Sequence, residues 1–393
     1  MKRKKWQIWL IANFCRLLLS ATFLFSGIVK LIDPRGTQYK LEDYAVAFDL
    51  YGIIPQDLFL VVAVMLALLE TYIGFNLFWG IRRRTTTRLA LIVMLVFTPV
   101  TLWLAMTGTM HDCGCFGDVI HLTPWQTVGK NVVLLAAAVV TVLNSRRLMR
   151  LITERNQWLL SIYAIIFSLL LVIYDIRYLP VIDFRPYHVG VDLPKAITEE
   201  LSNNTLSYQY LDFSMQTQEG EDITFEWLEQ PGYKFLLVSP DLEKADDSMM
   251  DRINAIYDYA QAQGYPFLAL TSSLKMTIDR WKDMTGAEYD FAIADGTMLK
   301  TMIRSNPGLF LFCDGVIYQK WSCYDLPVLE EEQLPLTDLK IGKMRQGGYM
   351  VAIYRLLIWF VLPLFLWAVI DRIWVGSKFY RRHKLHKDIE SSQ

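Results

Sequence analysis

The sequence predicts an α-helical membrane protein in which the last two spanning helices flank an α/β domain outside the membrane. Three observations lead to this fold class. Of the 393 residues, 53% are hydrophobic and only 20% are charged, which is more apolar than an ordinary soluble protein. Six apolar stretches are long enough to span a bilayer. The segment between the last two has the mixed composition of one globular domain.

The six apolar stretches each approach the roughly 20 residues that an α-helix needs to cross a ~30 Å hydrocarbon core. The first one follows basic residues, as a signal peptide does, but it is long and further spans follow, so we expect it to be retained. The stretches lie at about residues 8–31, 58–79, 89–106, 125–143, 158–174 and 350–370. Four of them fall in a first domain, 1–150. The remaining segments are a fifth helix with a linker, 151–178, a globular domain, 179–346, and a sixth helix with a basic tail, 347–393.

Basic residues between the spans predict the orientation of the chain. They precede the first span, separate spans two and three and spans four and five, and follow the sixth. They are Lys2, Arg3, Lys4, Lys5, Arg82, Arg83, Arg84, Arg88, Arg146, Arg147, Arg150, Arg155, Arg372, Lys378, Arg381, Arg382, Lys384 and Lys387. The positive-inside rule then places both termini in the cytoplasm and residues 175–348 on the opposite side. In a bacterium that side is the periplasm, and the membrane is the inner (cytoplasmic) one.

The charge balance limits the partners. Lysine and arginine total 39, aspartate and glutamate total 40, and the formal net charge is −1. Without a basic stripe we expect no nucleic acid partner. Membrane lipid is the partner that the composition predicts, and the residues identify no small-molecule substrate.

Two charged residues inside predicted spans are candidates for an intramembrane pair. Arg16 lies about eight residues, hence ~12 Å, from the cytoplasmic start of the first span. Glu70 lies about ten residues, hence ~15 Å, from the cytoplasmic end of the second. The matched depths predict an Arg16–Glu70 ion pair. The pair would either lock the helices together or serve a proton-linked or quinone-linked role, although no residue pattern identifies a bound cofactor.

The loop between spans three and four carries a pair of vicinal cysteines, Cys113 and Cys115, on either side of Gly114. Thr123 and Pro124 are a typical N-cap and first helical residue, so the fourth span is expected to begin there. The cysteines then lie at the outer membrane surface, in an oxidising compartment. A disulfide in so small a ring would be strained and labile.

Three interpretations of this loop remain open. Cys113 and Cys115 are redox-active thiols, with Lys130 nearby to favour a thiolate. Alternatively they form a structural disulfide or a buried thiol pair. In the third interpretation they bind zinc or copper together with His111 and His121, although the spacing matches no zinc finger.

Two motifs give the first domain a family resemblance. The run of residues 24–34, FSGIVKLIDP after Leu24, resembles the signature of the DoxX superfamily, and the Cys-Gly-Cys-Phe-Gly loop at 113–117 resembles its MauE branch. The resemblance covers about residues 8–145. It implies a four-helix transmembrane bundle. Family members are linked to respiratory or disulfide-related processes and to the maturation of methylamine dehydrogenase.

The segment 179–346 alternates predicted strands and helices. Apolar runs predict strands at 233–239, 265–271, 290–294, 309–313 and 316–322, and amphipathic patterns predict helices at 246–263, 274–285 and 297–304. Asp314-Gly315 between two apolar runs is a strong hairpin signal. Alternating strands and helices that end in a hairpin predict an α/β sandwich.

This order of elements resembles a thioredoxin-like domain. Pro307, in Asn306-Pro307-Gly308, stands where that fold has its cis-proline loop, and the following hairpin also matches. The chain departs from the pattern at Ser239-Pro240-Asp241-Leu242, where the family has Cys-x-x-Cys. The resemblance therefore implies a thioredoxin-like domain without oxidoreductase activity of the usual kind. Cys313, beside the proline loop, is predicted to be a core thiol.

Two functions fit these residues. In the first, Cys113 and Cys115 cycle between dithiol and disulfide, one attacking a disulfide and the other resolving the mixed species, in support of envelope redox chemistry or maturation of an unknown periplasmic client. In the second, the protein is a non-catalytic scaffold or assembly factor, and the domain without Cys-x-x-Cys binds a partner protein. The residues leave open whether the protein is an enzyme.

Overall fold

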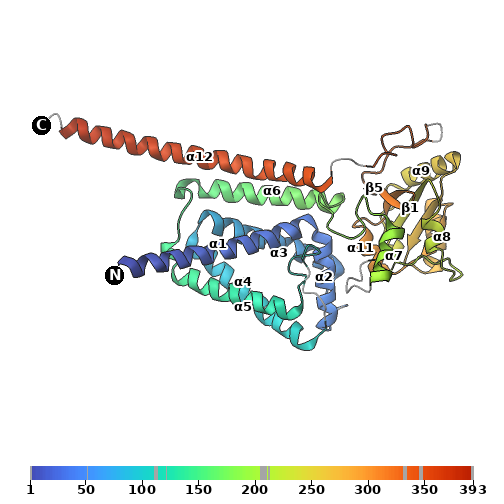
Figure 1. Cartoon of the computed structure of the whole chain (residues 1–393), viewed down its shortest axis with the longest axis horizontal. Coiled ribbons are helices and arrows are strands. Elements are labelled where there is room, and N and C mark those ends of the chain that lie inside the picture. Colours follow the sequence, from blue (N-terminus) through green and yellow to red (C-terminus); the bar gives the residue numbers. More distant parts are fainter. Residues whose placement is uncertain are drawn as a thin grey trace. The chain divides into compact units, whose positions relative to one another are not determined.

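The computed structural model describes residues 2–50, 52–109, 114–120, 122–203, 210, 213–330, 334–344 and 348–390 (Figure 1). The chain forms two compact units. We call Met1–Ile173 together with Ala352–Gln393 the membrane unit, and Tyr174–Val351 the sheet unit.

Six helices of the described chain are long and apolar enough to cross a membrane. They are α1 (Lys2–Ile32), α3 (Gln56–Trp79), α4 (Arg83–Thr107), α5 (Pro124–Leu143), α6 (Gln157–Arg177) and α12 (Gly348–Glu390). All six predicted spans are thus confirmed as helices, and the protein is a multi-pass membrane protein. Each helix extends beyond its predicted apolar run, and α12, with 43 residues, is about 65 Å long.

The predicted start of α5 is confirmed by its capping. The Thr123 side chain accepts a hydrogen bond from the Gln126 backbone N–H, and the Gln126 side chain accepts one from the Thr123 N–H. Pro124 occupies the first turn, where its missing N–H costs nothing. This capping box fixes where the loop before α5 ends.

A short helix that the sequence analysis did not predict, α2 (Pro34–Ala47), follows α1 directly and crosses its end (Figure 1). The Asp33 side chain accepts a hydrogen bond from the Gly36 N–H at 2.8 Å, and Pro34 occupies the first turn. These are the N-cap and first-turn residues that helices prefer. The chain therefore turns at Asp33, the one residue between α1 and α2, whose φ of −127° and ψ of 74° are not helical.

Helices α1 and α3 pack against each other through glycines. A Cβ at Gly27 would lie 2.6 Å from the Thr71 backbone nitrogen, and a Cβ at Gly74 would lie 2.5 Å from the Leu24 backbone nitrogen. Such small residues let two helix backbones approach closely in a membrane. The two contacts fix the register between α1 and α3. Helix α5 also packs on α1, and α4 packs on α3 and α5.

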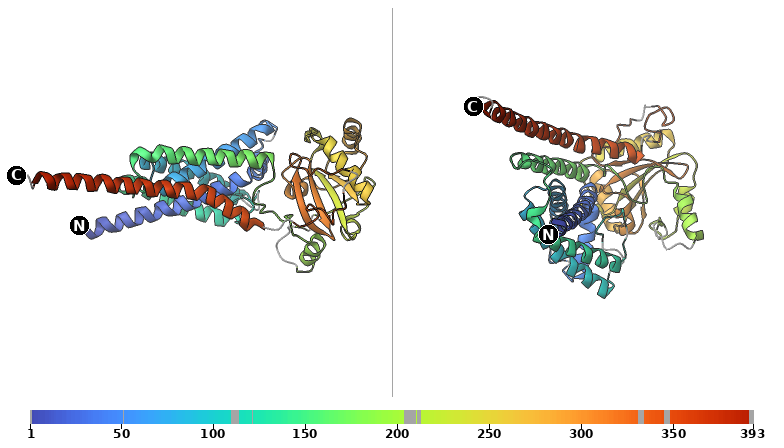
Figure 2. Two further views of the ribbon diagram at one scale, coloured as in Figure 1. Left: turned by 90° about the horizontal axis from the view of Figure 1, so that it is seen from above. Right: turned by 60° about the vertical axis from the view of Figure 1, so that its left-hand side comes forward.

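Helices α6 and α12 run side by side in both views of the molecule (Figure 2). An apolar cluster that includes Leu160, Ala164 and Leu364 joins them. At the basic end of α12, the buried Asp371 carboxylate accepts hydrogen bonds from the Thr153 N–H, the Thr153 hydroxyl and the Asn156 amide. This carboxylate holds α12 to the segment that precedes α6.

The sheet unit contains a five-stranded mixed sheet in the order β3-β2-β1-β4-β5. Strands β1, β2 and β3 are parallel to one another, whereas β4 is antiparallel to both β1 and β5. The strands are β1 (Tyr233–Ser239), β2 (Phe267–Thr271), β3 (Asp290–Ile293), β4 (Gly308–Cys313) and β5 (Val316–Ser322). All five predicted strands are confirmed. The Asp314-Gly315 hairpin is also present, with a register shift between Leu311 and Phe312.

Both faces of this sheet are covered. Leu236 and Val238 of β1 face one apolar core, and Phe235 and Leu237 face the other, as expected for a strand buried on both sides. The first core includes residues of α7 (Leu193–Asn203), α8 (Thr224–Leu228) and α11 (Gly296–Met302), and the second those of α9 (Met250–Gln263) and α10 (Lys275–Thr285). The sequence predicted α9, α10 and α11 but not α7 or α8.

Candidate functional site

The loop that carries Cys115 packs on the end of α1. Gly114 and Gly117 have φ of +58° and +55°, which favours glycine, and the Gly117 N–H donates to the Gly114 carbonyl at 3.1 Å. A Cβ at Gly117 would lie 2.8 Å from Cγ1 of Val29. The two glycines therefore permit both the tight turn and its close approach to α1. Cys113, His111 and His121 lie outside the described residues.

Two polar side chains of α1 hold the backbone of this loop. The Ser26 hydroxyl donates to the Cys115 carbonyl at 2.7 Å, and Lys30 Nζ donates to the same carbonyl at 2.9 Å. Lys30 Nζ also donates to Ser26 Oγ at 2.6 Å. Ser26 and Lys30 are 8% and 5% exposed, so these bonds form away from solvent. The segment 24–34 and the cysteine loop, which the sequence analysis treated as separate motifs, thus meet in one site.

The buried ammonium of Lys30 has a carboxylate partner on α3. Its Nζ lies 2.8 Å from Oε2 of Glu70, which is only 2% exposed. With Ser26, Glu70 and the Cys115 carbonyl as acceptors, all three N–H groups of the ammonium are satisfied. A buried ion pair persists only when its remaining hydrogen-bonding groups are also matched in this way.

The structure does not bring Arg16 and Glu70 together, so the predicted Arg16–Glu70 pair is replaced by Lys30–Glu70. Arg16 lies level with Gly80 at the end of α3, about ten residues and ~15 Å along the helix from Glu70. There its guanidinium donates to the Met149 carbonyl, and Asn13 accepts from the Met149 N–H. The depth argument failed because the glycine contacts, and not the distance from the basic flanks, set the register of α1 on α3.

A cavity of about 250 Å³ lies beside the loop, between α1, α2, α3, α4 and α5. Its wall is mainly apolar. Cys115 and the Lys30–Glu70 pair lie on one part of the wall, and Thr101 and Asn131, which are hydrogen-bonded to each other at 3.0 Å, lie on another. A mostly apolar cavity with a few convergent polar groups is the usual form of a small-molecule site.

Phe116, next to Cys115, fixes the loop on its other side. Its ring packs edge-on against Phe25 with centroids 5.3 Å apart, and Lys130 Nζ lies 4.2 Å from its centroid. Lys130, which the sequence analysis placed near the thiols, is therefore held over the neighbouring ring by a cation–π contact.

The metal interpretation gains no further ligand from the structure. Within the described ranges, no group of three or more histidine, cysteine, aspartate or glutamate side chains is arranged to hold a metal ion. His111, Cys113 and His121 fall in the gaps between those ranges, so this ligand set stays a prediction.

In the sheet unit, the segment after β1 is bound to the loop before β4. The Ser239 hydroxyl donates to Asn306 Oδ1 at 2.7 Å, and Asn306 Nδ2 donates to the Asp241 carbonyl at 2.7 Å. The Asn306–Pro307 peptide bond is cis. The polar groups at this edge of the sheet are thus engaged with one another.

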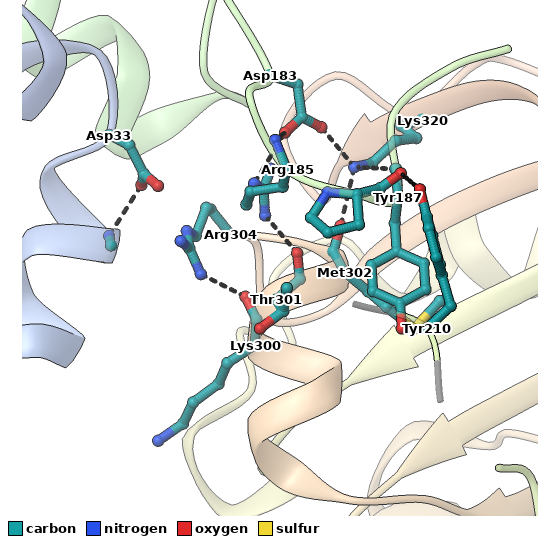
Figure 3. A network of polar contacts seen from close by, with 12 residues as sticks. Asp33, Asp183, Arg185, Tyr187, Tyr210, Lys300, Thr301, Met302, Arg304 and Lys320 are labelled. Atoms are coloured by element: carbon teal, nitrogen blue, oxygen red, sulfur yellow. Dashed lines mark hydrogen bonds and ion pairs between the residues drawn. The ribbon is translucent and has the colours of Figure 1, made fainter. Parts of the chain in front are cut away.

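A second polar network lies at the far edge strand β5 (Figure 3). Lys320 Nζ lies 2.7 Å from Asp183 Oδ2 and donates to the carbonyls of Tyr187 and Met302, while Arg185 Nε lies 2.8 Å from Asp183 Oδ1. Burial opposes ionisation of Asp183, but the charges of Arg185 and Lys320 outweigh it and lower its pKa. Burial lowers the pKa of Lys320 to about 8, so the pair is charged at neutral pH. This network fixes the segment before α7 to the sheet.

The two cysteines of the sheet unit are buried, Cys313 with 9% and Cys323 with 3% exposure. Burial and the charge of Asp314 raise the pKa of the Cys313 thiol. A buried thiol with a raised pKa is a poor nucleophile. Cys313 therefore has the environment of a core thiol.

Sequence reasoning missed Ser26 and Lys30 as site residues. A usable signal was present, because Lys30 is a lysine within an apolar run, four residues after Ser26, and side chains at that spacing share a helix face. The partner could not be predicted, since it depends on which residue of α3 lies opposite.

The helices and the site define the class of the protein. It is a multi-pass membrane protein with a cysteine-bearing loop whose backbone is hydrogen-bonded to the lysine of a buried ion pair. Residues 8–144, about a third of the chain, match the family model of methylamine utilisation protein MauE. The part of the membrane unit from α1 to α5 is therefore MauE-like, as the Cys-Gly-Cys-Phe-Gly motif predicted. No curated protein matches the chain.

Proposed function

We propose that the membrane unit carries out thiol–disulfide exchange through Cys113 and Cys115 and so supports the maturation of a protein partner outside the cytoplasm. The anchoring of the Cys115 backbone by Ser26 and Lys30 is the observation that carries this proposal. A loop stabilised by a structural disulfide would not require a buried ion pair bonded to its backbone. Exchange chemistry, in contrast, benefits from a thiol held in a defined position.

The exchange is balanced within the two protein partners. In the direction that oxidises the partner, a partner thiolate attacks the Cys113–Cys115 disulfide, forms a mixed disulfide and expels one loop thiolate. A second partner thiolate then attacks the mixed disulfide and expels the other loop thiolate. One disulfide is broken and one is formed, two electrons pass to the loop, and the reverse sequence reduces the partner.

We infer that the sheet unit is a thioredoxin-like module that binds the partner without chemistry of its own. The strand order, the helices on both faces and the cis peptide at Pro307 support this assignment. Ser239 stands at the position of the first missing thiol, and its hydroxyl donates to Asn306, which precedes the cis-proline. In this division of roles, the sheet unit binds the partner and the membrane unit transfers the electrons.

Exchange with a bound partner requires that the cysteine loop and the sheet unit face the same compartment. In our proposed topology the first four spans form the four-helix bundle of the DoxX and MauE proteins in a bacterial inner membrane. Both termini are cytoplasmic, and the cysteine loop and residues 175–348 are periplasmic. By its name the MauE family serves methylamine utilisation, so an enzyme of that process is one candidate partner.

Trapping of mixed disulfides in cells tests the exchange. With Cys113→Ala or Cys115→Ala the remaining loop thiol can attack a disulfide of the partner, but no second loop thiol is left to resolve the mixed disulfide. One of these variants should therefore accumulate a covalent adduct that reductant removes. The double variant should give none. Cys313→Ala, which changes a buried thiol of the sheet unit, is the matched control and should leave the adduct of the single variant in place.

The alternative is a scaffold that binds its partner without electron transfer. The hydrogen bonds between Ser239, Asn306 and Asp241 favour it, because they occupy the position where a thioredoxin-like domain would carry its own chemistry. If neither single-cysteine variant captures a partner and both support wild-type growth, the scaffold function replaces exchange.

A further inference from the structure

An apolar groove lies between α6 and α12, and cationic side chains lie at one end of the same two helices. We propose that this surface of the membrane unit binds one anionic phospholipid, with an acyl chain in the groove and the headgroup at the cationic end. The inference is independent of the proposed thiol exchange, because it rests on α6, α12 and the turn that precedes α6.

The groove is a cavity of about 320 Å³ whose wall consists of residues from α6 and α12. Leu160 and Leu364 of this wall belong to the apolar cluster that joins the two helices, and they are 1% and 6% exposed. Ile162 and Ile166 line the same cavity and are 45% and 51% exposed. The cavity therefore opens toward the helix surface that faces lipid in a bilayer.

The size of the groove favours an acyl chain over a helix of another protein. One turn of an α-helix with its side chains is roughly 10 Å across and 5.4 Å long, which is more than a cavity of about 320 Å³ holds. A cavity of about 150 Å³ already accommodates benzene. The groove thus has room for a stretch of hydrocarbon chain.

One hydrogen-bond donor in the groove requires an acceptor. The indole nitrogen of Trp367 is buried and has no hydrogen-bond partner among the described residues, and Trp367 is part of the cavity wall. An indole nitrogen only donates, and a buried donor without an acceptor costs free energy. The ester carbonyls of a phospholipid, which lie between the headgroup and the acyl chains, would supply this acceptor.

Two cations meet at Trp374, toward the basic end of α12. The guanidinium carbon of Arg155 lies 4.3 Å from the centroid of the Trp374 ring, and Nζ of Lys378 lies 4.9 Å from it. Within the described ranges neither cation forms an ion pair. The neighbouring carboxylates of Glu154 and Asp371 are bonded to other side chains. Two positive charges without a counter-charge favour an anionic headgroup at this ring.

The groove and the cations lie on one face of each helix. On α12, Trp374 follows Trp367 by seven residues, and Lys378 follows Trp374 by four. Before α6, Arg155 precedes Leu159 of the groove by four residues. Side chains at these spacings share a helix face. The rise from Trp367 to Trp374 is about 10 Å, less than half of a ~30 Å hydrocarbon core. One phospholipid therefore reaches both within one leaflet, which is the cytoplasmic leaflet in our proposed topology.

Native mass spectrometry tests the headgroup site. The delipidated full-length protein in detergent is titrated with dioleoyl-phosphatidylglycerol or dioleoyl-phosphatidylcholine, which share their acyl chains and differ in headgroup charge. We expect the first phosphatidylglycerol to bind at least about fivefold more tightly than the first phosphatidylcholine. Arg155→Gln combined with Lys378→Gln should remove this preference. Arg84→Gln combined with Arg88→Gln, at two exposed positions of α4, should retain it.

Two isoleucines of α6 provide matched variants for the acyl groove. Ile162→Trp fills the groove and should weaken the binding of both lipids by about tenfold. Ile165→Trp places the same side chain at a position that is 38% exposed and outside the cavity wall, and it should bind both lipids as wild type does. Ile166→Phe is a milder filling variant that should weaken binding if Ile162→Trp fails to fold.

Three results would overturn the assignment. The headgroup site is wrong if wild type binds the two lipids equally well, or if the preference survives Arg155→Gln with Lys378→Gln. The acyl groove is wrong if wild type, Ile162→Trp and Ile166→Phe bind lipid equally. If Ile162→Trp leaves lipid binding unchanged but alters the oligomeric mass of the protein, the groove is a contact between protein chains and not a lipid site.

Discussion

Lys30 is charged and buried in a spanning helix, and its neighbours explain how this is possible. The ammonium has one carboxylate and two further oxygens within 2.9 Å. Removing a single member of such a group leaves an uncompensated charge, which costs more than removing both members of the pair. The pair therefore connects the stability of α1 and α3 with the position of the cysteine loop.

Lys30→Met should destabilise the membrane unit strongly. The substitution leaves the Glu70 carboxylate buried without a cation, at a cost of roughly 3–5 kcal/mol. Lys30→Met combined with Glu70→Met removes both charges and should recover most of that loss. Thermal or denaturant unfolding of the detergent-solubilised protein measures both effects.

Ser20→Ala is the control for this comparison. Ser20 donates a buried hydrogen bond to the Gly74 carbonyl across the same two helices, and its loss should cost only about 1 kcal/mol. A Lys30→Met variant no less stable than Ser20→Ala would contradict the ion pair. Rescue of Glu70→Arg by Arg16→Glu would restore the pairing that the depth argument predicted.

The buried Asp183 gives a pH prediction for the sheet unit. Its lowered pKa means that its contribution to stability is present above about pH 3.9 and is lost as the pH falls through the folded-state value. Asp183→Asn should cost roughly 3–5 kcal/mol at pH 7, because Lys320 and Arg185 lose their counter-charge. The difference from wild type should shrink below about pH 4.

Urea titrations of the full chain between pH 7 and pH 3, followed by tryptophan fluorescence, measure this difference. Asp258→Asn, at an exposed position of α9, is the control and should be close to wild type throughout. A gap between Asp183→Asn and wild type that stays constant over the whole pH range would show that Asp183 does not act through its charge.

At the scale of elements, the contact between α6 and α12 depends on a proline. Pro363 lies inside α12 and lacks the N–H that would bond the Trp359 carbonyl four residues earlier. The Tyr163 hydroxyl of α6 donates to that carbonyl. A side chain of one helix thus satisfies the backbone group that the proline of the other leaves without its helical partner.

A double-mutant cycle tests this compensation. Tyr163→Phe should destabilise the protein by about 0.5–1.5 kcal/mol, but by close to nothing in a Pro363→Ala background, where the restored N–H bonds Trp359. Thermal unfolding of the four proteins in detergent gives the coupling. Equal effects of Tyr163→Phe in both backgrounds would exclude it.

The sequence predicted most elements because their signals are local. Six apolar runs and five strand patterns, bounded by residues such as Thr123 and Gly80, need no tertiary information. Helix α2 was missed although Asp33 and Pro34 marked its start, because its remaining residues do not form a clear apolar stripe at helical spacing. The Lys30–Glu70 site could not be predicted, because it depends on which residues of α1 face α3. The close approach of the two helices at Gly27 and Gly74 fixes that register, and counting residues from the ends of the spans does not reveal it.

At the scale of the whole molecule, the proposed function requires a shared compartment for the cysteine loop and the sheet unit. Reporter enzymes that are active only in the periplasm should be active when fused after Gly117 or within residues 241–264, and inactive when fused after Leu143. Activity in the cytoplasm for either of the first two fusions would contradict the topology and separate the loop from its partner.

The redox state of the cysteines in living cells tests the account most directly. Cells are pulsed with a membrane-permeant reductant and washed, and thiols are then alkylated with a mass tag at intervals. Cys313 and Cys323, which are buried, serve as internal references on the same chain. We expect Cys113 and Cys115 to become reduced together and to return to the disulfide within minutes, while the reference thiols do not change. A loop that stays oxidised throughout the pulse, or never forms a disulfide, would contradict it.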